Sequence, residues 1–76
     1  MEKEIACHDV YQASYFDYKN IPINLIREGR RVIFMLPDTP ETYRIMTEFN
    51  ANPIMPLLDY VTHLKKMRAK MIAMRG

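Results

Sequence analysis

The chain has 76 residues, of which 49% are hydrophobic and 26% charged, and its formal net charge at pH 7 is +2. A chain of this length predicts a single domain over residues 1–76, and its apolar fraction is high enough to form a core and to argue against disorder. Cys7 is the only cysteine, which excludes an internal disulfide, and two glycines are too few for a phosphate-binding glycine loop.

The first elements expected are a short strand and a helix. Apolar residues alternate within residues 1–7, which is the pattern of a strand added to a sheet. Asp9 and Gln12 have the spacing of a capping box, so a helix should run over residues 10–19. Apolar or aromatic side chains cover most of its circumference, and one face carries Tyr11, Tyr15 and Tyr18. Either both faces are buried, one of them at a subunit contact, or the tyrosine hydroxyls lie in water, which is the alternative we favour.

A β-hairpin is expected next, with strands over residues 23–27 and 31–36. If Glu28 and Gly29 are the two central residues of its turn, the apolar residues of both strands project to one face. That register pairs Leu25 with Val32, Ile23 with Phe34 and Ile21 with Leu36. Because glutamate is unfavourable at the first position of such a turn, a bulged turn with Gly29 in the left-handed conformation is the alternative.

The second face of the hairpin is less polar than a solvated face should be, because it carries Ile26, Ile33 and Met35. A two-stranded ribbon is not stable alone, so something has to cover these residues. The candidates are the N-terminal residues, the aromatic face of the first helix, or a second copy of the chain. We therefore take Ile26, Ile33 and Met35 as candidate self-association residues and expect a homodimer.

Two helices complete the chain. Asp38 or Thr39 caps the first, which should end at Phe49. Its inward side chains should be Tyr43, Ile45, Met46 and Phe49. The second is a long amphipathic helix over residues 56–74, which should contact every other element. Its apolar stripe is Leu57, Tyr60, Leu64, Met67, Met71 and Met74, widened by Leu58, Val61 and Ile72. The predicted fold class is α+β, in the order helix, β-hairpin, helix and long C-terminal helix, with an added N-terminal strand.

The face of the long helix opposite this stripe is basic. From Asp59 onward the chain carries one acid and five bases, a net charge of +4. Those bases are Lys65, Lys66, Arg68, Lys70 and Arg75. They either form a solvated face or contact an acidic protein or nucleic acid phosphate. A second cluster at the hairpin tip either helps to clamp a nucleic acid backbone or keeps the turn in water; it consists of Arg27, Arg30 and Arg31.

Side chains suited to catalysis or metal binding are few. Ser14 is the only serine, and His8 and His63 lie in no nucleophile motif. Cys7 and His8 would point to opposite faces of a strand, which argues against a thiolate pair. The methionines of the long helix have a spacing that could hold Cu(I), but a core stripe explains the same residues. We expect no enzyme activity, no metal and no cofactor.

Three segments carry the most distinctive local patterns, and they are spread along the chain between residues 9 and 67. They are residues 9–15 (DVYQASY), 28–34 (EGRRVIF) and 57–67 (LLDYVTHLKKM). In these segments the chain resembles a family of short bacterial proteins that is classed only as a domain of unknown function. The resemblance implies a single domain of a kind scattered among bacteria and mobile elements. It implies no activity, so it transfers no functional residue to this chain.

No run of residues approaches the roughly 20 apolar residues of a membrane span, and residues 1–10 lack the apolar segment of a signal peptide. We therefore expect a soluble, cytoplasmic protein with no membrane partner. The predicted function is a non-enzymatic binding or accessory protein that acts as a homodimeric protein-interaction module. One alternative is a nucleic-acid-binding regulatory protein that uses the basic face of the long helix. The least favoured alternative is a small enzyme or metal carrier.

Overall fold

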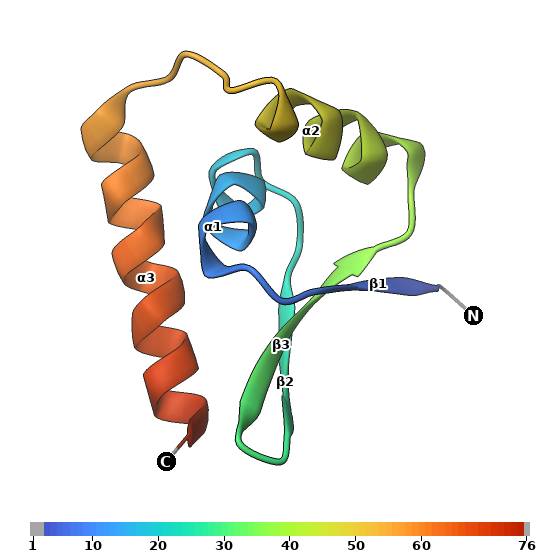
Figure 1. Ribbon diagram of the computed structural model, residues 1–76, viewed down its shortest axis with the longest axis vertical. Helices are drawn as coiled ribbons and strands as arrows, with labels where there is room; N and C mark the ends of the chain where they lie inside the picture. The colour runs from blue at the N-terminus through green and yellow to red at the C-terminus, as the bar shows by residue number, and fades with distance from the viewer. Residues whose placement is uncertain (1–2, 76) are drawn as a thin grey trace.

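A computed structural model describes residues 3–75 of the chain. Three helices and a three-stranded antiparallel sheet form an α+β domain, which confirms the predicted fold class and the long C-terminal helix (Figure 1). In chain order the elements are β1 (Glu4–Cys7), α1 (Val10–Tyr18), β2 (Asn24–Glu28), β3 (Arg31–Pro37), α2 (Pro40–Asn50) and α3 (Leu57–Arg75).

The sheet has the strand order β1-β3-β2, so the second strand of the hairpin is its centre. β1 pairs antiparallel with β3 and places Cys7 opposite Phe34 and Ile5 opposite Leu36. The predicted N-terminal strand is therefore confirmed, and it covers one of the two open edges of the hairpin.

The hairpin register differs from the predicted one. Glu28 lies opposite Arg31 and Leu25 opposite Phe34, so Gly29 and the residue after it are the two central residues of the turn. Gly29 has a φ of 63°, which glycine adopts without the steric cost that glutamate would have. The prediction that Glu28 and Gly29 are the central residues of the turn is therefore wrong by one position. This shifts the partner of each β2 residue by two residues, for Leu25 from Val32 to Phe34. Because side chains alternate with a period of two, the apolar residues nevertheless stay on the predicted face.

Both ends of α1 are defined by local hydrogen bonds. Asp9 is the N-cap, and its Oδ1 accepts a hydrogen bond of 2.9 Å from the backbone N–H of Tyr11. At the other end Asn20 has a φ of 64°, and the N–H of Ile21 donates to the carbonyl of Phe16 at 3.0 Å. This left-handed ending buries Ile21 against the helix and turns the chain toward β2.

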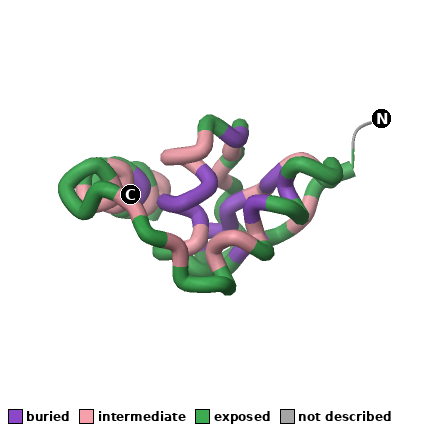
Figure 2. The backbone as a smooth tube through the Cα atoms, turned by 90° about the horizontal axis from the view of Figure 1, so that it is seen from above, coloured by how far each residue is buried: buried purple, intermediate pink, exposed green. Residues whose placement is uncertain are grey.

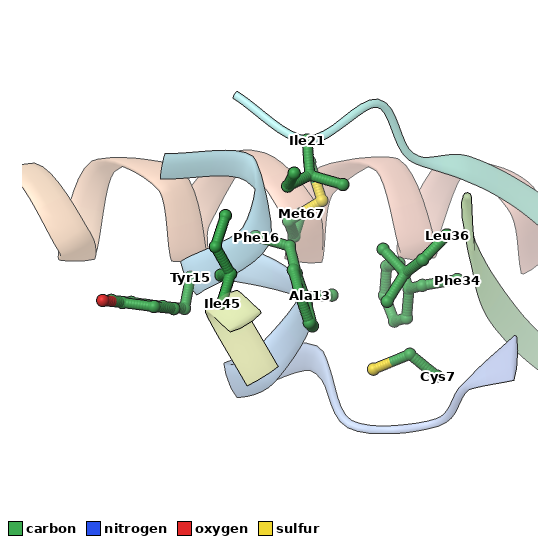
Figure 3. Close-up of a cluster of buried hydrophobic side chains, with 9 residues drawn as sticks. All are labelled: Cys7, Ala13, Tyr15, Phe16, Ile21, Phe34, Leu36, Ile45 and Met67. Atoms are coloured by element: carbon green, nitrogen blue, oxygen red, sulfur yellow. The ribbon is translucent and has the colours of Figure 1, made fainter. Parts of the chain in front are cut away.

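The centre of the molecule is α1, not the long helix. Four consecutive α1 residues are buried, namely Ala13, Ser14, Tyr15 and Phe16. The helix packs against α3, α2 and β1, and α3 also contacts β2 and β3 directly. Figure 1 shows α1 surrounded by the other elements. Figure 3 shows the nine side chains of the core, to which α1 contributes three. α3 packs mainly against α1, β2 and β3, so the expectation that it gathers every other element is met only in part.

The tyrosine face of α1 is also more buried than we predicted. Tyr15 is only 2% exposed, and its hydroxyl donates a 2.7 Å hydrogen bond to Oε1 of Glu48 on α2. Tyr11 stays exposed, and Tyr18 is half-buried. Both faces of α1 are thus covered at Tyr15, and the cover comes from the chain's own α2.

The apolar stripe of α3 is confirmed from Tyr60 to Met74 and fails at its first residue, Leu57, and on its flank. Met67 is 1% exposed, and Tyr60, Leu64, Met71 and Met74 are half-buried. The prediction is wrong for three stripe residues, because Leu57, Leu58 and Ile72 are exposed. The molecule is flat, with extents of 34 × 32 × 17 Å. α3 lies at its side and is covered on one side only, and Figure 2 shows the exposed positions on its outer side.

Of the two predicted caps of α2, Asp38 and Thr39, the structure uses Thr39. Its Oγ1 accepts a hydrogen bond of 3.3 Å from the N–H of Thr42. Thr42 and Ile45 are the buried residues of this helix, and Phe49 is half-buried on the same face. Tyr43 lies outside this three-and-four spacing and is exposed, so the prediction of an inward Tyr43 is wrong.

Candidate anion-binding site

At one end of the molecule, Arg75 of the basic cluster on α3 lies near Arg30 and Arg31 of the hairpin cluster. The tip of the β2–β3 hairpin and the C-terminal end of α3 lie at the same end in Figure 1. Between them is a pocket of about 450 Å³, which we call the basic pocket. Its lining residues are His8, Val10, Arg30, Arg31, Val32, Met71 and Arg75.

The lining of the basic pocket suits an anion. Arg30, Arg31 and Arg75 carry permanent charges and forked N–H donors that match phosphate and carboxylate oxygens. Among the residues described, no acidic side chain lines the pocket. Buried Val32 and half-buried Met71 form an apolar floor.

Local structure explains why these arginines converge. The turn at Gly29 places Arg30 at the tip and Arg31 at the first position of β3. Arg75 lies in the last turn of α3, where the helix dipole favours a cation. Arg27 does not line the pocket, and its Nε donates a 3.0 Å hydrogen bond to the carbonyl of Gly29. Of the predicted hairpin cluster, Arg27 therefore supports the turn while the other two arginines face the pocket.

Two of the predicted bases on α3 hold this helix against α1. Lys66 Nζ forms an ion pair of 3.2 Å with Asp17. Arg68 donates from Nη2 to the Tyr11 hydroxyl at 2.8 Å, and its guanidinium lies 5.5 Å from the centre of that ring. Lys65 and Lys70 are exposed. The basic face of α3 is thus partly an intramolecular contact and is not a uniform binding surface.

The most specific polar contact in the structure is one that the sequence reasoning missed. His63 Nδ1 lies 2.5 Å from Asp17 Oδ2, and the His63 ring packs edge-on against Tyr18 with centroids 5.6 Å apart. Burial alone would raise the pKa of Asp17, but hydrogen bonds from His63 and Lys66 outweigh it and lower that pKa. The spacing of His63 from Tyr60 and Met67 places it at the edge of the stripe, a signal that could have identified it.

This Asp17–His63 pair has the orientation of the acid and base in a catalytic triad, but its surroundings favour a structural role. Ser14 is buried, and its hydroxyl donates to the carbonyl of Val10 at 2.6 Å. Cys7 is buried in the core, and this burial raises the pKa of its thiol. Its neighbour His8 follows the end of β1 and is exposed, whereas Cys7 is buried.

Candidate metal ligands are dispersed over the described part of the chain. Within residues 3–75, no three side chains of His, Cys, Asp or Glu lie close enough together to hold a metal ion. Met67 belongs to the core, and Met71 packs against it, so the core explanation of the methionine spacing has structural support.

The candidate self-association residues of the hairpin are only partly accessible. Ile33 is buried within the chain, Met35 is half-buried, and Ile26 is exposed. The addition of β1 widens the sheet beside them. The apolar surface on this face is therefore smaller than the sequence predicted.

Comparisons of the chain with protein-family models, with curated proteins and with solved structures find no match. The resemblance to a bacterial domain of unknown function therefore stays a prediction, and the evidence for function rests on the site itself. None of the helices in the described part of the chain has the length and apolar character needed to cross a membrane.

Proposed function

We propose that this chain is a non-enzymatic binding module that recognises the phosphate backbone of nucleic acid at its basic pocket. The observation that carries this proposal is the convergence of Arg30, Arg31 and Arg75 on one apolar-floored hollow. Arginine binds phosphate through two parallel N–H donors, and such contacts position a nucleic acid backbone.

The charge distribution of the molecule supports the same function. Glu41 and Glu48 on α2 pair with Arg44, and Glu48 also pairs with Lys19 at 3.1 Å. These acids form their ion pairs at α2, away from the basic pocket. Among the described residues that line the basic pocket, none is acidic. At the pocket's end of the molecule, Arg27, Arg30, Arg31 and Arg75 outnumber Glu28, which lies opposite Arg31 in the hairpin. A net positive field of this kind steers a polyanion toward that end.

The binding of fluorescent single-stranded and duplex oligonucleotides, measured by anisotropy at several salt concentrations, tests the proposal. We expect the affinity to fall as salt increases, because bound phosphates release counterions. Replacement of Arg30 or Arg75 by alanine should weaken binding to all sequences and reduce the salt slope by about 1 in each case.

Arg44→Ala is the matched control, since it removes the same charge from exposed positions of α2. It should leave binding unchanged. The proposal fails if no oligonucleotide binds at low salt, if affinity is independent of salt, or if Arg44→Ala weakens binding as much as Arg75→Ala. Binding of acidic peptides with no binding of nucleic acid would also contradict it.

A second candidate function, as a protein-interaction module, is favoured by a separate observation. Exposed apolar side chains gather where α2 connects to α3, at the end of α3 remote from Arg75.

A further inference from the structure

We propose that two copies of this chain associate through the segment that joins α2 to α3. The chain there exposes three large apolar side chains within five positions. Ile54 is 103% exposed, Leu57 is 71% exposed and Leu58 is 77% exposed. Large apolar side chains exposed close together in this way are typical of an interaction site. We call Ile54, Leu57 and Leu58 with the hollow beside them the linker surface.

The hollow of the linker surface lies next to the exposed side chains. It has a volume of about 460 Å³, and its walls include Tyr15, Phe49, Met55 and Tyr60. Ile54 and Leu57 stand at its rim. In Figure 1 the linker arches from α2 to α3 beyond the end of α1. A projection and a hollow on one surface allow each copy to insert a side chain into the other, as a twofold-symmetric interface requires.

The charge around the linker surface favours a second copy as the partner. Residues 49–58 include no charged side chain. Two copies that meet there bring no like charges together, although each chain has a net charge of +2. The basic pocket lies toward the other end of α3, a helix about 28 Å long, so the two pockets would remain far apart. A highly charged partner would find no complementary charge at this surface.

The exposed area of the chain agrees with an uncovered interface. The chain exposes 5440 Å². A compact monomer of 9.1 kDa should expose about 4,900 Å². The excess of roughly 500 Å² is more than half of the roughly 800 Å² that each partner buries in a standard interface. Ile54, Leu57 and Leu58 contribute to this exposed area, and covering them in a dimer would reduce it toward the area of a compact monomer.

This dimer has a consequence that rests on the proposed function. The two basic pockets of one dimer would contact one long strand at two places, and the second contact would be intramolecular. Long oligonucleotides should then bind the dimer more tightly than short ones. The association itself does not depend on nucleic acid.

Sedimentation equilibrium of the full chain at micromolar concentrations tests the interface. We expect the wild-type chain to sediment with twice its monomer mass of 9.1 kDa. Leu57→Glu should raise the dissociation constant of the dimer by at least about tenfold, because it places a charge at the centre of the interface. Since Leu57 is exposed in the single chain, the variant should keep the wild-type circular dichroism spectrum.

Ile72→Glu is the matched control, because Ile72 is an equally apolar residue of α3 that is 66% exposed but lies outside the linker surface. It should leave the dissociation constant unchanged. A monomeric wild-type chain at all concentrations overturns the proposal. Loss of the dimer in Ile72→Glu or Ile26→Glu, with Leu57→Glu still dimeric, would overturn it by assigning the interface to another face.

The two proposals can fail separately. If the nucleic acid proposal is wrong, the chain still dimerises and Leu57→Glu still dissociates it. If the dimer proposal is wrong, short oligonucleotides still bind with a dependence on Arg75, and Leu57→Glu changes neither the mass nor the preference for long strands.

Discussion

The carboxylate of Asp17 on α1 and the imidazole of His63 on α3 meet at 2.5 Å, although these residues are 46 positions apart in the chain. Lys66 contacts the same carboxylate, and the Tyr60 hydroxyl donates to the carbonyl of Tyr11 at 2.9 Å. These polar contacts flank the buried Met67. The interface between the two helices thus has an apolar centre and a polar border, which specifies one way of packing α3 against α1.

Asp17→Asn should destabilise the protein by about 1–3 kcal/mol, because two charge-assisted hydrogen bonds lose their carboxylate. Urea unfolding followed by circular dichroism measures this change. Glu4→Gln is the control, since Glu4 is exposed and its substitution should cost less than about 0.5 kcal/mol. Equal stability of Asp17→Asn and the wild type would show that this contact does not hold the helices together.

Stability should fall on acidification. The pKa of Asp17 is lowered below its ordinary value of 3.8 in the folded protein, where hydrogen bonds from His63 and Lys66 outweigh the effect of burial. Its contribution is therefore fully present above the unfolded pKa near 4 and is lost as pH decreases through the folded pKa. Urea midpoints measured from pH 6 to pH 2.5 should decline less steeply in Asp17→Asn. The same slope in both proteins would contradict the assignment.

Met67→Ala should cost about 2–5 kcal/mol, because it leaves a cavity beneath α3 at a position that is 1% exposed. The total stability of a small domain is only about 5–15 kcal/mol, so thermal unfolding should shift by many degrees. Ile72→Ala on the exposed side of the same helix provides the comparison. If both substitutions had similar effects, the buried face of α3 would be wrongly placed.

Gly29→Ala should destabilise the hairpin by about 1–2 kcal/mol. An added Cβ would meet no atom within 4 Å, so the cost comes only from the φ of 63°, which alanine adopts poorly. Gly29→Asn should be milder, because asparagine tolerates the left-handed region. Thermal melts of the two variants measure the difference. An unchanged melting temperature in Gly29→Ala would contradict the turn centred on Gly29 and Arg30.

Much of the fold follows from local patterns in the sequence. The three-and-four spacing of apolar residues identifies the long helix, and Asp9 and Thr39 mark the beginnings of the other two. The alternation of side chains assigns the faces of the hairpin, even though the predicted register is displaced by two residues. These features depend on neighbours within a few positions, which the sequence displays directly.

The candidate site follows from the sequence only in part. The sequence identifies the basic residues but not the pocket, because Arg30 and Arg75 meet only when α3 packs beside the hairpin. It likewise cannot tell that Lys66 and Arg68 are engaged with α1 or that Leu57 is left uncovered. Spacing along the chain determines which side chains share a face. Which faces meet is decided by long-range packing, since burying one apolar surface excludes the others from the same space.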